Sequence, residues 1–443
     1  MMKPNEIFEG FSKLSKEEKL DFVASVFSNP KKFIDELKSY WHDDTDIQQL
    51  FEEFSENTIT NYFLPYGIVP NLRIGEKVYS VPMVIEESSV VAAASKAAKF
   101  WANRGGFHAE VSSMLKVGQV HFIWHGDKRK IKASVPEIKQ RLRKSTRDIT
   151  SNMEKRGGGI TSIDLMDMSQ EIEGYYQIRA KFDTRDAMGA NFINSCLEEF
   201  ATSLKNFFAE SSLFTGEEKE CSIIMAILSN YTPECLVKCH VECDIEDLEG
   251  ADDQLSAEEF AWKFEKAVQI AHIDVNRATT HNKGIFNGID SVAIATGNDF
   301  RAIEASGHTY AARSGKYRSL TEVSLENGRF RYSLELPLAL GTVGGLTSLH
   351  PLAKRSMEIL GRPDAEELMK IAAVVGLANN FGAIKSLITK GIQTGHMKMH
   401  LMNILNYFGA TIEEKKKAFE YFKNNKVSFA NGSSFIAQLR KNM

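Results

Sequence analysis

The sequence has few of the features that mark secreted or membrane proteins. Its 443 residues include only five cysteines, an odd number, and four of them fall between Cys196 and Cys239. This is a poor disulfide framework, so we expect a reducing, cytoplasmic setting. No stretch approaches the roughly 18 consecutive apolar residues that a membrane span needs. The polar N-terminal residues also lack the apolar segment of a secretory signal, and we expect no membrane association.

The sequence also has little net charge. A net charge of −4 argues against a general binder of polyanions, and we expect no nucleic-acid partner. Charged residues make up 25% of the chain and hydrophobic residues 43%, which is ordinary for a folded protein and excludes a disordered one. We find no internal repeat, and a length of 443 residues predicts two or three domains of about 150 residues each.

Two common nucleotide-binding motifs are absent. No Gly-x-Gly-x-x-Gly follows a predicted strand and no Gly-x-x-x-x-Gly-Lys-Ser/Thr is present, so neither a Rossmann domain nor a P-loop is supported. The turn from Asp186 to Asn191 offers a weaker signal. It follows a predicted strand and opens a predicted helix, and its small residues let a pyrophosphate approach the N-terminal amides of that helix.

The order of the predicted elements indicates an α+β fold. Between about 115 and 228 the pattern reads strand, helix, strand, strand, helix, strand, which is the order of a ferredoxin-like split βαβ domain. Mixed structure precedes and follows this segment, and lysine-rich helices form the C-terminal end. The predicted division of the chain is therefore into residues 1–114, 115–228, 229–390 and 391–443.

The cysteines and histidines suggest a metal site, but their spacing argues against one. Cys235, Cys239 and Cys243 share one face of an alternating strand while His240 points to the other face, so buried thiols are the better interpretation. His396 and His400 share a helix face, but without a Glu after the first His they do not form the metalloprotease motif. We predict no metal, and a lone catalytic role for His396 stays open.

A basic stretch runs from Lys128 to Arg147. It holds nine basic residues, while the only acids there are Glu137 and, just before the stretch, Asp127. The pattern alone favours a solvated helix face. Nucleic acid is a weaker alternative, because aromatic residues do not interleave with the charges. A third alternative is a site for the phosphates of a small ligand, such as a nucleotide 2′-phosphate.

A lysine among small and amide residues is the strongest chemical signal. Lys283 lies in the stretch from Thr280 to Gly288, Asp299 follows sixteen positions later, and Glu87 closes an apolar extended segment. Such groups at the ends of apolar strands are costly unless they are paired, so a Lys–carboxylate site is expected. A purely structural ion pair is the alternative.

Taken together, the motifs resemble those of a class II 3-hydroxy-3-methylglutaryl-CoA (HMG-CoA) reductase. They occur in family order over nearly the whole chain: Glu56-Asn57, Leu64-Pro65-Tyr66, Val84 to Ser95, Asp186 to Asn191, His281 to Gly284, Asn287 to Asp290, Ala295 to Asp299, Val343 to Gly345, and Gly391 to Met397. The resemblance implies a four-electron reduction of (S)-HMG-CoA to mevalonate and CoA by NAD(P)H, a step of isoprenoid biosynthesis. It also implies a homodimer with shared active sites, with further pairing of dimers left open.

The resemblance assigns four catalytic residues. Lys283 polarises the thioester carbonyl and then the aldehyde, and Asp299 holds that lysine charged. Glu87 acts as general acid and base near the same oxygen, and His396 protonates the departing CoA thiolate. The family's large domain binds the substrate, residues 115–228 resemble its non-Rossmann cofactor domain, and residues 391–443 resemble a mobile flap that carries His396.

The resemblance also implies residues that bind the two ligands. For the hydroxymethylglutaryl group they are Ser89, Arg277, Asn287 and Asn379, the last standing where many members have Gln. For the cofactor they are Arg143, Lys144, Arg147, Thr150, Asp186, Met188, Gly189 and Asn191. NAD-preferring members carry an acid where Thr150 stands, so NADPH is expected. Asp148 close by weakens this inference, and NADH is the alternative.

Two alternatives to this function are open to the sequence. One is the same reaction run oxidatively to degrade mevalonate, which an NADPH preference disfavours. The other is a catalytically inactive protein that binds CoA ligands. The sequence argues against it, because Glu87, Lys283, Asp299 and His396 are all retained.

Overall fold

The computed structural model describes residues 7–389 and 401–441. The chain divides into two compact units, one ending at Pro65 and one beginning at Tyr66. The first unit contains a short 3₁₀ turn and three helices: Phe11–Lys13, α1 (Lys16–Ala24), α2 (Pro30–Lys38) and α3 (Thr45–Glu52). Ser15 caps α1 in a capping box with Glu18, as the Ser-x-x-Glu pattern predicts.

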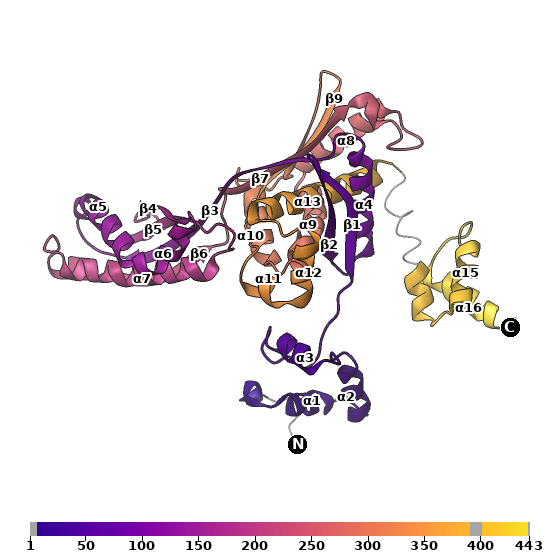
Figure 1. The fold of residues 1–443 in the computed structure, drawn as a ribbon, viewed down its shortest axis with the longest axis horizontal. Helices are drawn as coiled ribbons and strands as arrows, with labels where there is room; N and C mark the ends of the chain where they lie inside the picture. Colours follow the sequence, from indigo (N-terminus) through magenta and orange to yellow (C-terminus); the bar gives the residue numbers. More distant parts are fainter. Residues whose placement is uncertain (1–6, 390–400, 442–443) are drawn as a thin grey trace. The chain divides into compact units, whose positions relative to one another are not determined.

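The second unit is a mixed α+β fold built on a seven-stranded antiparallel sheet and a two-stranded hairpin (Figure 1). The order along the sheet is β4-β5-β3-β7-β9-β8, and β6 pairs with β3 off this path. The hairpin consists of β1 (Tyr66–Ile74) and β2 (Lys77–Val84). The strands of the sheet are β3 (His108–Ile123), β4 (Gly159–Asp167), β5 (Tyr175–Asp183), β6 (Ser222–Ser229), β7 (Cys235–Asp244), β8 (Thr321–Glu326) and β9 (Arg329–Pro337).

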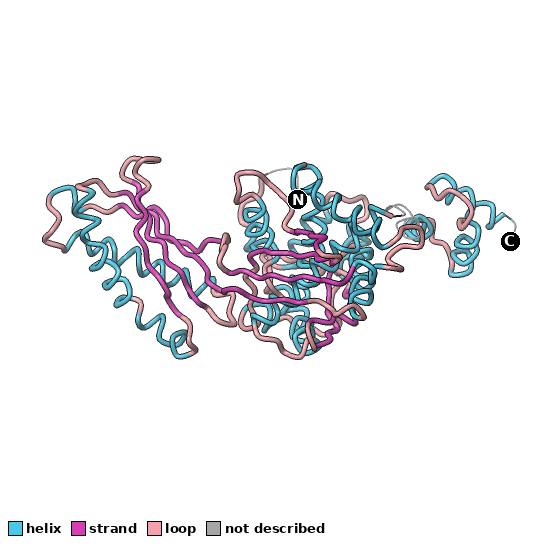
Figure 2. The backbone as a smooth tube through the Cα atoms, turned by 90° about the horizontal axis from the view of Figure 1, so that it is seen from above, coloured by secondary structure: helices cyan, strands magenta, loops and turns pink. Residues whose placement is uncertain are grey.

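Strand β3 changes partners along its length. Residues from His108 to Met114 pair with β7, whereas residues from Leu115 to Ile123 pair with β5. β6 pairs with the same later half of β3. The single strand β3 therefore belongs to two regions of the sheet. Figure 2 shows the strands of the sheet extending from one group of helices to another.

The region around β4, β5 and β6 has its own hydrophobic core. Its helices are α5 (Lys128–Ser145), α6 (Arg147–Lys155) and α7 (Ala190–Glu210), and its core is rich in aromatic side chains such as Phe122, Trp124 and Phe208.

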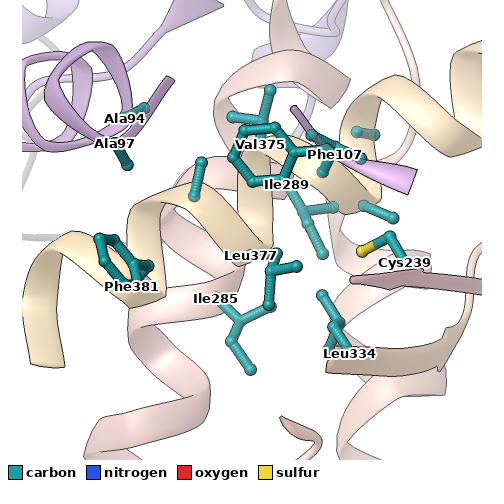
Figure 3. Packing of buried hydrophobic residues seen from close by; sticks show 14 of the residues in the cluster. Ala94, Ala97, Phe107, Cys239, Ile285, Ile289, Leu334, Val375, Leu377 and Phe381 are labelled. Carbon is teal, nitrogen blue, oxygen red and sulfur yellow. The ribbon is translucent and has the colours of Figure 1, made fainter. Parts of the chain in front are cut away.

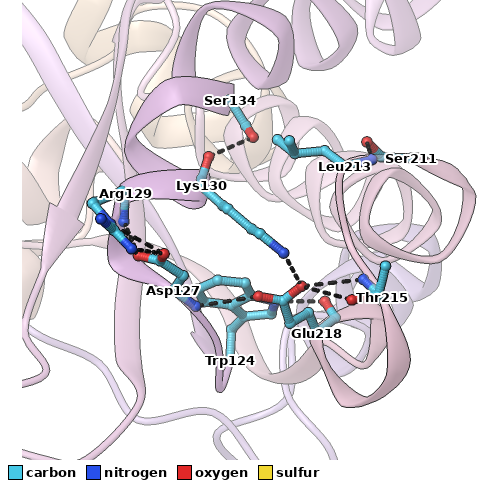
Figure 4. Close-up of polar contacts among 9 residues, drawn as sticks. All are labelled: Trp124, Asp127, Arg129, Lys130, Ser134, Ser211, Leu213, Thr215 and Glu218. Atoms are coloured by element: carbon cyan, nitrogen blue, oxygen red, sulfur yellow. Dashed lines mark hydrogen bonds and ion pairs between the residues drawn. The ribbon is translucent and has the colours of Figure 1, made fainter.

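Figure 4 shows the polar contacts that fix the start of α5. Lys130 Nζ lies 2.5 Å from Glu218, and the backbone carbonyl of Glu218 accepts a 2.7 Å hydrogen bond from the Trp124 indole.

The long helix α13 (Ala365–Ile388) is part of the main hydrophobic core and packs against three other helices. It is long and apolar enough to cross a membrane by composition alone, but 67% of its most apolar window is buried inside the fold. Figure 3 shows Val375, Leu377 and Phe381 of α13 packed among other buried side chains. The three helices against α13 are α4 (Ser88–Ala102), α8 (Ala257–Ile273) and α9 (Val275–Ala295). α10 (Phe300–Ala311) and α12 (Pro351–Ile359) pack against α9, and α11 (Gly345–Leu349) packs against α12.

The glycine-bearing stretch around Lys283 lies inside α9 rather than at the end of a strand, which corrects the expectation above. Glycine weakens an isolated helix, but here close packing requires it. A Cβ added at Gly288 would lie 2.7 Å from the carbonyl oxygen of Val375, so α9 and α13 approach closely only because that position has no side chain.

The described C-terminal residues are helical, as expected. They form a helical segment at 401–407 followed by α15 (Ile412–Tyr421) and α16 (Phe429–Lys441). A small core of their own joins them, with Leu405 and Ile436 almost fully buried.

Candidate active site

Glu87 and Lys283 form an ion pair between two helices. Glu87 is the N-cap residue of α4, directly after β2, and Lys283 lies in α9. Lys283 Nζ is 3.6 Å from Glu87 Oε2, and the side chains keep 63% and 37% of their surface exposed. The hydroxyl of Ser89 donates a hydrogen bond to the other carboxylate oxygen of Glu87. The pair is therefore accessible to a ligand.

The pair opens into a cavity of about 530 Å³ bordered by α4, α9 and α13. All four predicted substrate-binding residues line this cavity together with the pair: Ser89, Arg277, Asn287 and Asn379. Asn379 has 3% of its surface exposed, and its amide donates a 2.9 Å hydrogen bond to the Val90 carbonyl. The sequence prediction thus names residues from three separate segments that share one cavity.

The charges lining the cavity are mostly positive. Lys96, Arg277, Lys283 and Lys385 face it, whereas Glu87 is the one carboxylate among its described lining residues. Burial lowers the pKa of Lys385. An excess of cations favours an anionic ligand that carries carboxylate or phosphate groups. Lys96 and Lys385 were missed by the sequence analysis, because a lone lysine on a helix is usually solvated.

Buried polar side chains fix the segment of α9 around Lys283. His281 Nε2 lies 2.6 Å from the Thr321 hydroxyl, and the Asn380 amide donates a 2.7 Å hydrogen bond to the His281 carbonyl. Asn282 donates to the Arg318 carbonyl and accepts from the Leu320 amide. Burial, with Arg277 as a second cause, lowers the pKa of His281 to about 3, so this ring is neutral.

Asp299 lies outside this cavity in the described part of the chain. It caps α10, accepting hydrogen bonds from the amides of Arg301 and Ala302, and its carboxylate pairs with the Arg301 guanidinium at 3.0 Å. Partial burial alone would raise the pKa of Asp299. The hydrogen bonds and the charge of Arg301 outweigh it and hold the pKa below its usual value. Within the described residues we find no Lys283–Asp299 ion pair. His396 lies outside the described residues.

The predicted pyrophosphate turn leads from β5 into α7. Gly189 is the N-cap residue of this 21-residue helix, has a φ of 88°, and leaves the helix without a side-chain cap. A Cβ added at Gly189 would lie 2.4 Å from Thr184, so only glycine fits. Met188 is partly exposed and Asn191 is exposed. Asp186 accepts a 3.0 Å hydrogen bond from the Ala365 amide at the start of α13.

The predicted 2′-phosphate residues differ in their availability. Lys144 and Arg147 are exposed, and neither forms an ion pair within the described ranges. The Arg143 guanidinium donates to the Ile160 and Thr161 carbonyls. Thr150 has 1% of its surface exposed, and its hydroxyl lies 3.4 Å from the Arg147 carbonyl. Of the four, Lys144 and Arg147 are best placed to reach a ligand.

Two further cavities gather none of the predicted residues. One, of about 610 Å³, lies against β7, β8 and β9, and the other, of about 530 Å³, lies beside β2 and α13. Nowhere in residues 7–389 and 401–441 do three His, Cys, Asp or Glu side chains gather as metal ligands would. All five cysteines are free and buried, and Cys235, Cys239 and Cys243 alternate on the buried face of β7, as expected.

The chain is similar to proteins of one family over most of its length. The family model described as hydroxymethylglutaryl-coenzyme A reductase matches residues 15–401. A 3-hydroxy-3-methylglutaryl-coenzyme A reductase of Archaeoglobus fulgidus is 35% identical over 433 residues, which cover 97% of this chain and 94% of that protein.

Solved structures agree with this similarity. The class II 3-hydroxy-3-methylglutaryl-CoA reductase of Streptococcus pneumoniae bound to NADPH in open conformations is 35% identical, with a TM-score of 0.71 over 87% of this chain and 100% of that one. A second structure of the Streptococcus pneumoniae enzyme is 33% identical, with a TM-score of 0.72 over 98% of this chain and 100% of that one.

Proposed function

This chain belongs to the class II hydroxymethylglutaryl-coenzyme A reductase family, and we propose that it reduces HMG-CoA to mevalonate and CoA with NADPH. The observation that carries the proposal is the cavity in which Lys283 and Glu87 pair beside Ser89, Arg277, Asn287 and Asn379. Its cationic lining suits a substrate with one carboxylate and several phosphates.

Lys283 is the electrophilic group of the proposed mechanism. Reduction of a thioester places negative charge on the carbonyl oxygen, first in the thioester and again in the aldehyde. An ammonium group stabilises that charge where it develops. Glu87, 3.6 Å from this ammonium, moves the proton to and from the same oxygen. Arg277 clamps the free carboxylate of the substrate. His396 protonates the leaving thiolate, because imidazole titrates near neutrality.

The residues of the predicted cofactor region fit a nicotinamide dinucleotide phosphate. The uncapped start of α7, with Gly189 leaving room for close approach, suits a pyrophosphate. The exposed Lys144 and Arg147 suit a 2′-phosphate. When bound, the cofactor supplies one hydride in each of the two reduction steps. The NADPH-bound relative from Streptococcus pneumoniae supports the same cofactor here.

The surroundings of Asp299 support a homodimer with shared active sites. Asp299 pairs with Arg301 in its own chain and does not line the Lys283 cavity. Apolar side chains are exposed nearby, on α10 at Phe300 and from the loop before α11 into α12: Val343, Leu346, Leu349 and Leu352. Exposed apolar groups of this kind mark protein contacts. In the proposed dimer, this surface brings Asp299 of one copy to Lys283 of the other.

We assign the chain's parts as the sequence predicts. Residues 115–228 are proposed to be a ferredoxin-like cofactor domain inserted between 1–114 and 229–390 of the substrate domain. The strand order β4-β5-β3-β6 and the change of β3 partners at Leu115 support this division. Residues 391–443 are proposed to be the flap that brings His396 to the site. The five free cysteines support a cytoplasmic setting.

A stoichiometric assay tests this function. The purified protein is mixed with HMG-CoA and NADPH, and NADPH oxidation, free CoA and mevalonate are each measured. We expect two NADPH oxidised for each CoA released and each mevalonate formed. Acetyl-CoA, which lacks the carboxylate that Arg277 would bind, serves as the control substrate. If HMG-CoA is bound without NADPH oxidation, the protein is a CoA-ligand binding protein instead.

A further inference from the structure

Lys116 is buried between the sheet and the predicted pyrophosphate turn. It lies on β3 with 3% of its surface exposed, and among the lysines that the structure describes no other is buried. A buried ammonium group is costly unless it is paired or well hydrogen-bonded, so its presence requires a specific role.

The Lys116 ammonium binds the turn that joins β5 to α7. It donates a 2.6 Å hydrogen bond to the Thr184 hydroxyl and lies 3.4 Å from the Ala187 carbonyl. The Thr184 hydroxyl in turn donates to the Ala187 carbonyl at 2.6 Å, and the Ala187 amide donates to the Thr184 carbonyl at 3.0 Å. Lys116 thus closes a network that fixes the backbone just before Gly189.

The nearest carboxylates are bound to other groups. Asp183 accepts the Arg185 amide at 2.9 Å and lies 3.6 Å from its guanidinium, and Asp186 accepts the Ala365 amide. Among the described ion pairs none includes Lys116. Its positive charge is therefore not neutralised by a direct partner, and burial lowers its pKa.

The same turn contacts the loop that follows β9. The Thr342 amide donates to the Asp186 carbonyl at 2.8 Å, and Ala187 forms a parallel bridge with Val343. A Cβ added at Gly341 would lie 2.5 Å from the Met188 amide nitrogen, so the two backbones are in close contact. A change in the conformation of the turn would therefore shift both the start of α7 and this loop.

From this geometry we propose that Lys116 is a positioning residue for NADPH. It holds the turn in the conformation that presents the α7 amides to the diphosphate, and its charge lies behind them. The inference rests on the proposed cofactor site but adds a residue that touches no ligand itself.

The test compares Lys116→Met and Thr184→Val with Lys205→Met, which replaces an exposed lysine of α7. NADPH affinity is measured by titration calorimetry, and KM and kcat by steady-state assay. For Lys116→Met we expect the NADPH Kd and KM to rise about tenfold or more, because the turn loses its charge-assisted hydrogen bond from Lys116 to Thr184. The KM for HMG-CoA and the kcat at saturation should change less than about threefold, and Lys205→Met should match the wild type.

An NADPH Kd within about twofold of the wild type in folded Lys116→Met overturns the proposal. A similar rise in the KM for NADPH and in the KM for HMG-CoA, with a similar fall in kcat, also overturns it, because such changes indicate general structural damage. If Lys116→Met does not fold, Thr184→Val decides by the same criteria. A wild-type protein that binds NADPH but does not reduce HMG-CoA refutes the proposed function and leaves the calorimetric test of Lys116 intact.

Discussion

Lys283 Nζ lies 3.6 Å from Glu87 Oε2, and this contact joins the middle of α9 to the N-cap residue of α4. The cation and the proton-carrying group therefore lie side by side in the cavity lining, and the Ser89 hydroxyl donates a hydrogen bond to the carboxylate. A carbonyl oxygen that contacts both groups from the cavity would receive both charge stabilisation and a proton.

A mixing experiment tests the shared active site. Lys283→Ala and Asp299→Ala chains are each expected to be inactive, and they are co-expressed so that hybrid dimers form. Half of the dimers should be hybrids, and each hybrid should hold one complete site, so activity should recover to about a quarter of the wild-type value. Recovery no greater than the residual activity of either variant would place Lys283 and Asp299 in the same chain's site.

Cofactor preference should depend on Lys144 and Arg147. We expect kcat/KM for NADPH to exceed that for NADH by about tenfold or more, because two exposed cations can bind a 2′-phosphate. The double variant Lys144→Gln/Arg147→Gln should lose most of this gap without a loss of NADH activity. Lys139→Gln, on α5 but paired with Asp164, is the matched control. A wild-type enzyme that prefers NADH would contradict this assignment.

The free energy of unfolding should decrease as the pH is lowered, and His281 is one cause. Burial depresses its folded-state pKa to about 3, whereas an unfolded histidine titrates near 6.5. The unfolded state therefore takes up the proton first as pH falls. The histidine's contribution is intact above pH 6.5 and is lost toward pH 3, at about 1.4 kcal/mol per pH unit. Denaturant unfolding of wild type and His281→Gln at several pH values measures this, and identical slopes would exclude the effect.

The five cysteines should be inert in the native state. Burial raises the pKa of the Cys196 and Cys221 thiols to about 12. It is also the main cause that raises the pKa of Cys235 and Cys243 to about 11. The pKa of Cys239 is raised by burial as well. These groups are therefore protonated thiols at pH 8, and the thiolate is the reactive form. A thiol reagent at pH 8 should label no cysteine rapidly, and all five after unfolding. Rapid native-state labelling would show an exposed thiol.

Local patterns in the sequence were sufficient to predict several parts of the fold. Alternation placed Cys235, Cys239 and Cys243 on one buried face of β7, with His240 on the other, because a strand has a period of two. Ser15 and Glu18 have the spacing of a capping box, which indicates a helix start, and α1 begins at Lys16. The residues expected to bind the substrate share a cavity because α4, α9 and α13, which carry them, border the same space.

Other parts depend on contacts that a single sequence does not reveal. The stretch with Gly284 and Gly288 was expected at the end of a strand, yet it lies inside α9, where α13 packs closely against its backbone. β3 begins at His108, before the strand expected from about residue 115, because β7 pairs with its first half. Lys116 gave no signal, since nothing local distinguishes a buried lysine from a solvated one. The Asp299–Arg301 pair likewise follows from the geometry at the start of α10.

Lys283→Ala tests the central claim most directly, with Lys263→Ala on the surface of α8 as its control. Reductase turnover and equilibrium binding of HMG-CoA are measured for both variants. Loss of the group that stabilises the oxyanion should lower kcat by about a hundredfold to a thousandfold. Binding of HMG-CoA should survive, because the other cavity residues remain, and Lys263→Ala should keep wild-type turnover. Near-native kcat in Lys283→Ala would contradict the account.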